Sequence, residues 1–136
     1  MISRAAWALA ALLSLTLLVY ESVTYGWAMG ATVVVFLLLP DIALIGGFDP
    51  VRPGRLRVSH IPLYNALHRP WAGLALLLLG ALVTLPAIGG VEGGKLIAAA
   101  GLAWIAHIAV DRAVGYGLRD AEGAVRGSHG PTPCRA

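Results

Sequence analysis

Four apolar runs, each close to the length that a helix needs to cross a lipid bilayer, limit what this chain can fold into. A spanning helix needs about 20 predominantly apolar residues. The runs cover residues 2–20, 25–45, 71–88 and 96–114, which is most of a chain of 136 residues. We therefore expect an all-α polytopic membrane protein, with a four-transmembrane-helix bundle in residues 1–118 and a polar, mobile tail in residues 119–136.

The composition supports membrane insertion. Hydrophobic residues make up 58% of the chain, charged residues only 12%, and the mean hydropathy is +0.78, which excludes an ordinary soluble domain. Arg4 precedes an apolar stretch within the first run, as in a secretory signal, but no small-x-small cleavage site follows that stretch. We expect this run to be retained as a helix.

The distribution of positive charge predicts the orientation. If the N-terminus is cytoplasmic, nine of the ten lysine and arginine residues fall on the inside and only Lys95 falls outside. This bias predicts a protein of the cytoplasmic membrane with both termini in the cytoplasm. The net charge of +3 then reflects topology and attraction to anionic headgroups. The bilayer is the expected partner, and nothing indicates nucleic acid binding.

Two prolines predict breaks in the helices at the cytoplasmic face. Pro40 removes the hydrogen bond to the carbonyl of Phe36 and ends or kinks the second helix. Pro70 disfavours helix at Arg69, so we expect a short helix, a kink and then the third span. Polar backbone is therefore expected at this face of the bundle.

Small residues predict where helices touch. Gly73, Gly80 and the stretch 98–101 offer smooth surfaces for close packing. The spacing of Gly26 and Gly30, at the expected start of the second helix, also allows two backbones to approach. Self-association into a homo-oligomer is therefore compatible with the sequence, which does not determine the oligomeric state. Glu21 is expected to end the first helix as a solvated turn carboxylate.

His107 and Asp111 mark the fourth run as the place to look for function. They lie four residues apart and so share one helix face, and ionisable groups within a membrane helix are costly. With the N-terminus inside, Asp41 and the segment 64–68 reach the same end of the bundle. The expected cluster comprises Asp41, Tyr64, Asn65, His68, His107 and Asp111.

Three interpretations of this cluster fit the residue types. Two imidazoles and two carboxylates suit a divalent metal such as Zn, Mn or Fe, with His68, His107, Asp111 and Asp41 as ligands. Without a metal, Asp111 would orient His107 for proton transfer. In the third interpretation the cluster is purely structural and fixes the helix register.

Our leading hypothesis is an enzyme that acts on a lipid-like or membrane-dissolved small molecule by metal-assisted hydrolysis or by acid–base proton transfer. His107 would be base or ligand, Asp111 would orient it, and His68 and Asp41 would complete the catalytic site. Tyr64 and Asn65 would position substrate. The alternative is a non-catalytic small membrane subunit or binding protein whose cluster is structural or relays protons, so whether the protein is an enzyme stays open.

Three blocks of this sequence resemble a known family. They are Leu39-Pro40-Asp41, then Leu63-Tyr64-Asn65-Ala66-Leu67-His68, and finally the stretch from Trp104 to Leu118 that includes Gly115-Tyr116-Gly117. The blocks are similar to those of the DUF4260 family of small bacterial membrane proteins. The resemblance implies a bacterial four-helix protein, and its signature positions add Arg112 and Tyr116 as candidates to bind substrate.

Two tail residues complete the set of candidates. Members of this family tend to carry a histidine shortly after the Gly-Tyr-Gly block, so His129 is a candidate to fold back over the site. Cys134 is the single cysteine of the chain and excludes an internal disulfide.

Overall fold

The computed structural model describes residues 2–85 and 93–126, and within these residues it contains helices and no β-strand. The elements are α1 (Arg4–Tyr25), α2 (Trp27–Leu38), the 3-10 helices η1 (Leu39–Leu44) and η2 (Val58–His60), α3 (Ile61–Leu67), α4 (Trp71–Thr84) and α5 (Gly93–Val114). Four segments are long and apolar enough to cross a membrane: Arg4–Tyr25, Trp27–Leu44, Val58–Thr84 and Gly93–Val114. The predicted fold class is confirmed.

Helices α1 and α2 form an antiparallel hairpin. Ser3 begins α1 by accepting a hydrogen bond from the Ala6 N–H (3.1 Å), and Gly26, at φ 81°, makes the turn to α2. The prediction for Glu21 was wrong, because α1 continues past it to Tyr25. Gly26 also does not lie on a helix face with Gly30: α2 begins at Trp27, and a Cβ on Gly26 would meet nothing within 4 Å.

Helix α5 is the centre of the bundle and packs on α1, α2 and α4. Its contact with α4 is backbone to backbone. A Cβ on Gly101 would lie 2.3 Å from the Leu77 nitrogen, and one on Gly80 would lie 2.2 Å from the Ala98 nitrogen. Only glycine leaves room for such an approach, so the predicted packing surfaces of α4 and α5 are confirmed.

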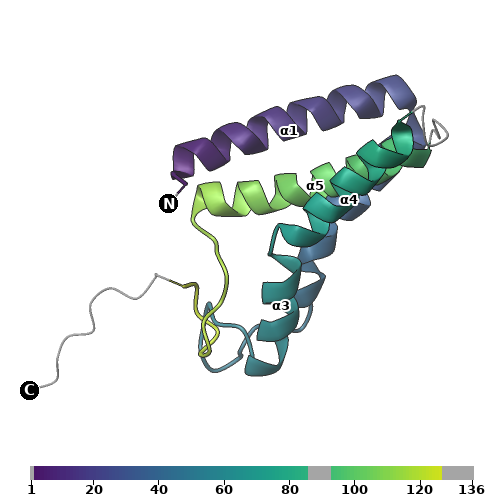
Figure 1. The fold of residues 1–136 in the computed structure, drawn as a ribbon. Coiled ribbons are helices and arrows are strands. Elements are labelled where there is room, and N and C mark those ends of the chain that lie inside the picture. Colours follow the sequence, from purple (N-terminus) through teal and green to yellow (C-terminus); the bar gives the residue numbers. More distant parts are fainter. Residues whose placement is uncertain (1, 86–92, 127–136) are drawn as a thin grey trace, which may run out of the picture.

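The two predicted breaks are present and shape one end of the bundle. Helix α2 ends at Leu38 and becomes η1, which contains Pro40, while α3 ends at Leu67 before Pro70 and α4 follows at an angle to it (Figure 1). With 14 residues, α4 is only about 21 Å long, less than the roughly 30 Å hydrocarbon core. The segments η1 and α3 must therefore complete the second and third spans.

A loop and the start of the predicted tail pack together beneath this end (Figure 1). Residues 119–126 form a turn in which Arg119 bridges to Val125, and Gly123 accepts a hydrogen bond from the Leu56 N–H of the loop (2.9 Å). Gly123 has φ 81°, and a Cβ there would overlap the Leu56 carbonyl. The expectation of a mobile tail was wrong for these residues, because they close against the loop.

Candidate metal centre

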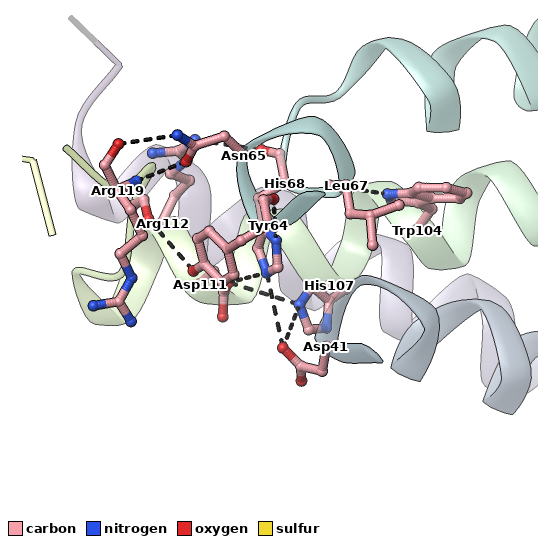
Figure 2. Close-up of polar contacts among 11 residues, drawn as sticks. Asp41, Tyr64, Asn65, Leu67, His68, Trp104, His107, Asp111, Arg112 and Arg119 are labelled. Atoms are coloured by element: carbon pink, nitrogen blue, oxygen red, sulfur yellow. Dashed lines mark hydrogen bonds and ion pairs between the residues drawn. The ribbon is translucent and has the colours of Figure 1, made fainter. Parts of the chain in front are cut away.

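Four of the predicted residues meet where η1, α3 and α5 come together (Figure 2). His68 Nε2 lies 3.3 Å from Asp111 Oδ2 and 3.8 Å from Asp41 Oδ1. His107 Nε2 lies 3.6 Å from Asp111 Oδ2 and 3.5 Å from Asp41 Oδ1. The two histidines and two aspartates from three separate elements therefore form one cluster, defined here as the His/Asp cluster.

The two imidazoles are withdrawn from the surface. His68 is 2% exposed, and the Nε2 atoms of both His68 and His107 are buried without a hydrogen-bond partner in the described part of the chain. Asp41 is the accessible member, with 44% of its side chain exposed. The cluster thus has a buried histidine side and an open carboxylate side.

The hydrogen bond of His68 Nδ1 determines whether Nε2 of the same ring can act as a metal ligand. His68 Nδ1 lies 2.9 Å from the carbonyl oxygen of Tyr64. A carbonyl only accepts, so Nδ1 must donate, and in a neutral imidazole Nε2 is then a bare lone pair. That lone pair faces carboxylate oxygens, which are also lone-pair atoms. Either a metal cation between these atoms or a proton on Nε2 makes this arrangement favourable.

The spacing of the ligand atoms suits a metal ion. Ligands about 2.0–2.2 Å from a tetrahedral ion lie roughly 3.3–3.6 Å from one another. The four nitrogen-to-oxygen distances of the His/Asp cluster run from 3.3 to 3.8 Å. Asp41, His68 and His107 each offer one atom, all within 4.8 Å of one another. A divalent ion can be held by these three residues, with Asp111 as a fourth candidate ligand.

The break between α3 and α4 is stabilised by donors from α5. Trp104 Nε1 donates to the Leu67 carbonyl (2.8 Å), and Arg112 Nη2 donates to the His68 carbonyl (3.5 Å). These carbonyls lose their helical partners because α3 stops before Pro70. Polar backbone at membrane depth is tolerated where protein satisfies it, so α5 both supplies His107 and holds the turn that carries His68.

Tyr64 and Asn65 occupy different places around the His/Asp cluster. The Tyr64 ring stacks on His68 with ring centres 3.8 Å apart, and its hydroxyl donates to the Gly117 carbonyl (3.4 Å). Asn65 points away and binds the backbone of Arg119, accepting from its N–H (2.7 Å) and donating to its carbonyl (3.0 Å). The structure does not bring the Asn65 amide into the cluster.

Arg119 is a functional candidate that sequence reasoning missed. It is 5% exposed, its Nη1 donates to the carbonyls of Gly54 (3.0 Å) and Gly123 (3.4 Å), and its guanidinium carbon lies 5.2 Å from the Tyr64 ring centre. In the sequence analysis, Arg119 contributed only to the positive charge from which the orientation in the membrane is predicted. The only sequence signal for a functional role is that Arg119 lies two residues after the Gly115-Tyr116-Gly117 block, and this position does not indicate that the side chain is buried.

A cavity of about 380 Å³ opens beside the cluster. Its walls include Asp41, Tyr64, Asp111, Tyr116 and Arg119. Of the remaining predicted residues, Arg112, in the last turn of α5, does not line this cavity, and His129 and Cys134 fall outside the described residues.

Comparison with known proteins identifies the family and no reaction. No curated protein and no solved structure matches this chain. The family model described as "Domain of unknown function (DUF4260)" matches residues 6–129, nearly the whole chain, as the resemblance of the three sequence blocks implied. The chain therefore belongs to the DUF4260 family.

Proposed function

We propose that this protein is a divalent-metal-dependent hydrolase that acts on a lipid-like substrate at the membrane interface. The observation that carries the proposal is the buried Nε2 of His68, which lies 3.3 Å from the Asp111 carboxylate while Nδ1 of the same ring is bonded to the Tyr64 carbonyl. Metal-ligating histidines commonly have their second nitrogen fixed in this way.

The members of the His/Asp cluster take separate roles in this proposal. Asp41, His68 and His107 hold the ion, because their ligand atoms converge. When bound, a divalent ion supplies a Lewis acid and a nucleophilic water at neutral pH. Asp111 lines the cavity and accepts the proton that the attacking water gives up.

The surroundings support a substrate that enters from the membrane. The cluster lies between two interrupted helical spans, α2–η1 and α3–α4, and interrupted spans are frequent at binding sites within membranes. The cavity walls combine the two carboxylates with apolar side chains, among them Leu44, Phe48 and Val125. A substrate with both a polar and an apolar part suits this lining.

We further propose that the site faces the cytoplasm. The described ends of α1 and α5 that lie near the cluster carry Arg4 and Arg112, and the loop there carries Arg52, Arg55 and Arg57. At the other end, Lys95 lies over the ring of Tyr25, 4.5 Å from its centre, as expected for an interfacial anchor.

Metal analysis of the full-length protein in neutral detergent tests the function. After exposure to Zn²⁺, Mn²⁺ or Fe²⁺ and removal of excess ion, we expect about one ion per chain, and at least about tenfold weaker binding in His68→Ala and His107→Ala. His60→Gln is the matched control, because His60 binds the Ala43 carbonyl (3.0 Å) outside the cluster. Its ion content should equal that of the wild type.

Two results would count against the proposal. Wild-type protein that retains no ion above the buffer blank would leave a protonated imidazole between the carboxylates, as in a proton relay or a structural cluster. Equal loss of ion from His60→Gln and the cluster variants would show that the histidines act through stability alone.

A further inference from the structure

Two hollows of different character meet at Asp41. One is the cavity of about 380 Å³ beside the His/Asp cluster, which also contains Arg119. The other is an open groove of about 320 Å³ along α2 and η1, lined by Asp41 and by Val35, Leu38, Leu39, Ile42 and Ile45. Apart from Asp41, the groove is lined by apolar side chains, and most of it lies on a segment that is long and apolar enough to cross a membrane. An amphiphile could therefore place its polar end in the cavity and its chain in the groove.

Arg119 gives the cavity a positive wall. Its side chain is 5% exposed, and its Nε is buried without a hydrogen-bond partner in the described part of the chain. The two carbonyls that accept from Nη1 carry no net charge. Burying a guanidinium is costly unless it gains charged partners, so an arginine held this deeply in a cavity wall indicates an anionic ligand.

The backbone around Arg119 is built to hold it in place. Asn65 from α3 binds both its N–H and its carbonyl, and the 119–126 turn closes against the loop at Leu56. The Tyr64 ring lies between the Arg119 guanidinium and the His68 imidazole (Figure 2). Arg119 and the His/Asp cluster thus form two walls of one cavity, separated by an aromatic ring.

We propose that the substrate is a phosphate monoester of a membrane lipid, with the phosphate between Arg119 and the His/Asp cluster and the hydrocarbon chain in the groove beside Asp41. This inference rests on the proposed hydrolase function. A phosphate ester is favoured over a carboxylate because the substrate group beside Arg119 must be anionic, and the proposed reaction must be able to hydrolyse that same group. Arginine matches phosphate oxygens in geometry as well as charge.

The reaction that follows is balanced by groups already present. The water oxygen forms a bond to phosphorus, and the bond between phosphorus and the lipid oxygen breaks. The proton of the water passes to Asp111, which then returns it to the leaving lipid oxygen, so that the lipid part leaves as an alcohol. The products are an alcohol that remains in the membrane and inorganic phosphate, and no oxidant or reductant is involved.

Binding of dodecyl phosphate to the ion-loaded, full-length protein in maltoside detergent tests this substrate class. We expect dodecyl phosphate to bind and to release inorganic phosphate, whereas dodecyl trimethylammonium does neither. Arg119→Gln should raise the Kd for dodecyl phosphate by about tenfold or more with ion content unchanged, because a charge-assisted contact is lost. Arg69→Gln, which removes an exposed arginine next to His68, should stay within about twofold of wild type.

Butyl phosphate, which has a short chain, distinguishes a lipid substrate from a soluble phosphate ester. If the groove holds a chain, butyl phosphate should bind at least about a hundredfold more weakly than dodecyl phosphate, because fewer methylene groups are buried. Equal affinities would overturn the lipid assignment. If Arg119→Gln does not fold, Arg119→Lys keeps the charge without the planar fork and should still raise the Kd severalfold.

The outcomes separate this inference from the function on which it rests. Ion binding with no Arg119-dependent binding of dodecyl phosphate would overturn the substrate class and leave the metal site intact. Arg119-dependent binding of dodecyl phosphate by protein that retains no ion would support the anionic substrate and overturn the hydrolase.

Discussion

His68 has two ring nitrogens in opposite surroundings. Nδ1 is bonded to the carbonyl of its own helical turn, whereas Nε2 is buried toward two carboxylates. The acceptor is the carbonyl of Tyr64, four residues earlier in α3. The helix therefore orients the imidazole itself and leaves the second nitrogen free for the cluster.

At the residue scale, Asn65→Ala should destabilise the protein by about 1–3 kcal/mol, because it leaves the N–H and carbonyl of Arg119 without partners in a partly buried site. Thermal unfolding in detergent measures the effect. Thr32→Ala is a suitable control, since its hydroxyl bonds only the Ala28 carbonyl of the same helix. Equal stability of Asn65→Ala and the wild type would show that the Arg119 turn does not depend on this amide.

Among the elements, α4 and α5 fix the position of the backbone that carries the His/Asp cluster. Helix α5 carries His107 and Asp111 and supplies the donors that bind the turn after α3. Its close contact with α4 depends on glycines at Gly73, Gly80, Gly94 and Gly101. The position of the His/Asp cluster thus depends on backbone packing more than a turn away from it.

We expect Gly101→Ala to destabilise the bundle by about 1–3 kcal/mol or more, because the new methyl would lie 2.3 Å from the Leu77 nitrogen. Gly30→Ala provides the matched control, since the nearest atom to its Cβ is Ser22 Cβ at 3.8 Å. The comparison is made by thermal unfolding. If both variants were equally stable, α4 and α5 could not pack as closely as described here.

Pro40 is expected to place Asp41 by ending α2 and imposing the 3-10 geometry of η1. In Pro40→Ala the restored N–H can bond the Phe36 carbonyl, so α2 can continue and turn Asp41 away from His107. Ion affinity should then fall by about tenfold or more, as measured by competition with a chelator. Pro53→Ala, in the exposed loop, should leave the affinity unchanged.

Over the whole molecule, the broken spans and the excess of arginine lie at the same end. The loop between η1 and η2 and the 119–126 turn close over that end, while Tyr25 and Lys95 mark the other. In the topology that we propose, the His/Asp cluster would lie between the membrane interior and the more basic surface, where an amphiphile with an anionic head would bind.

Thiol labelling in intact cells tests the orientation of the whole chain. In a Cys134→Ser background, Thr24→Cys should react with a membrane-impermeant maleimide, whereas Arg69→Cys should react only after the cells are permeabilised. Both positions are exposed and lie toward opposite ends of the bundle. The reverse pattern would place the His/Asp cluster at the outer surface and refute the predicted topology.

The sequence by itself determined the spans, the two breaks and the packing glycines of α4 and α5, which follow from hydropathy and from proline and glycine chemistry. The alternation of the spans also placed Asp41, His68, His107 and Asp111 at the same end of the bundle, and the tertiary structure then brought their side chains into one cluster. The tertiary structure decided which nitrogen of His68 faces the carboxylates, that Asn65 holds Arg119, and that the 119–126 turn closes on the loop. These features depend on contacts between residues far apart in the chain, and no local pattern of residue types specifies such contacts.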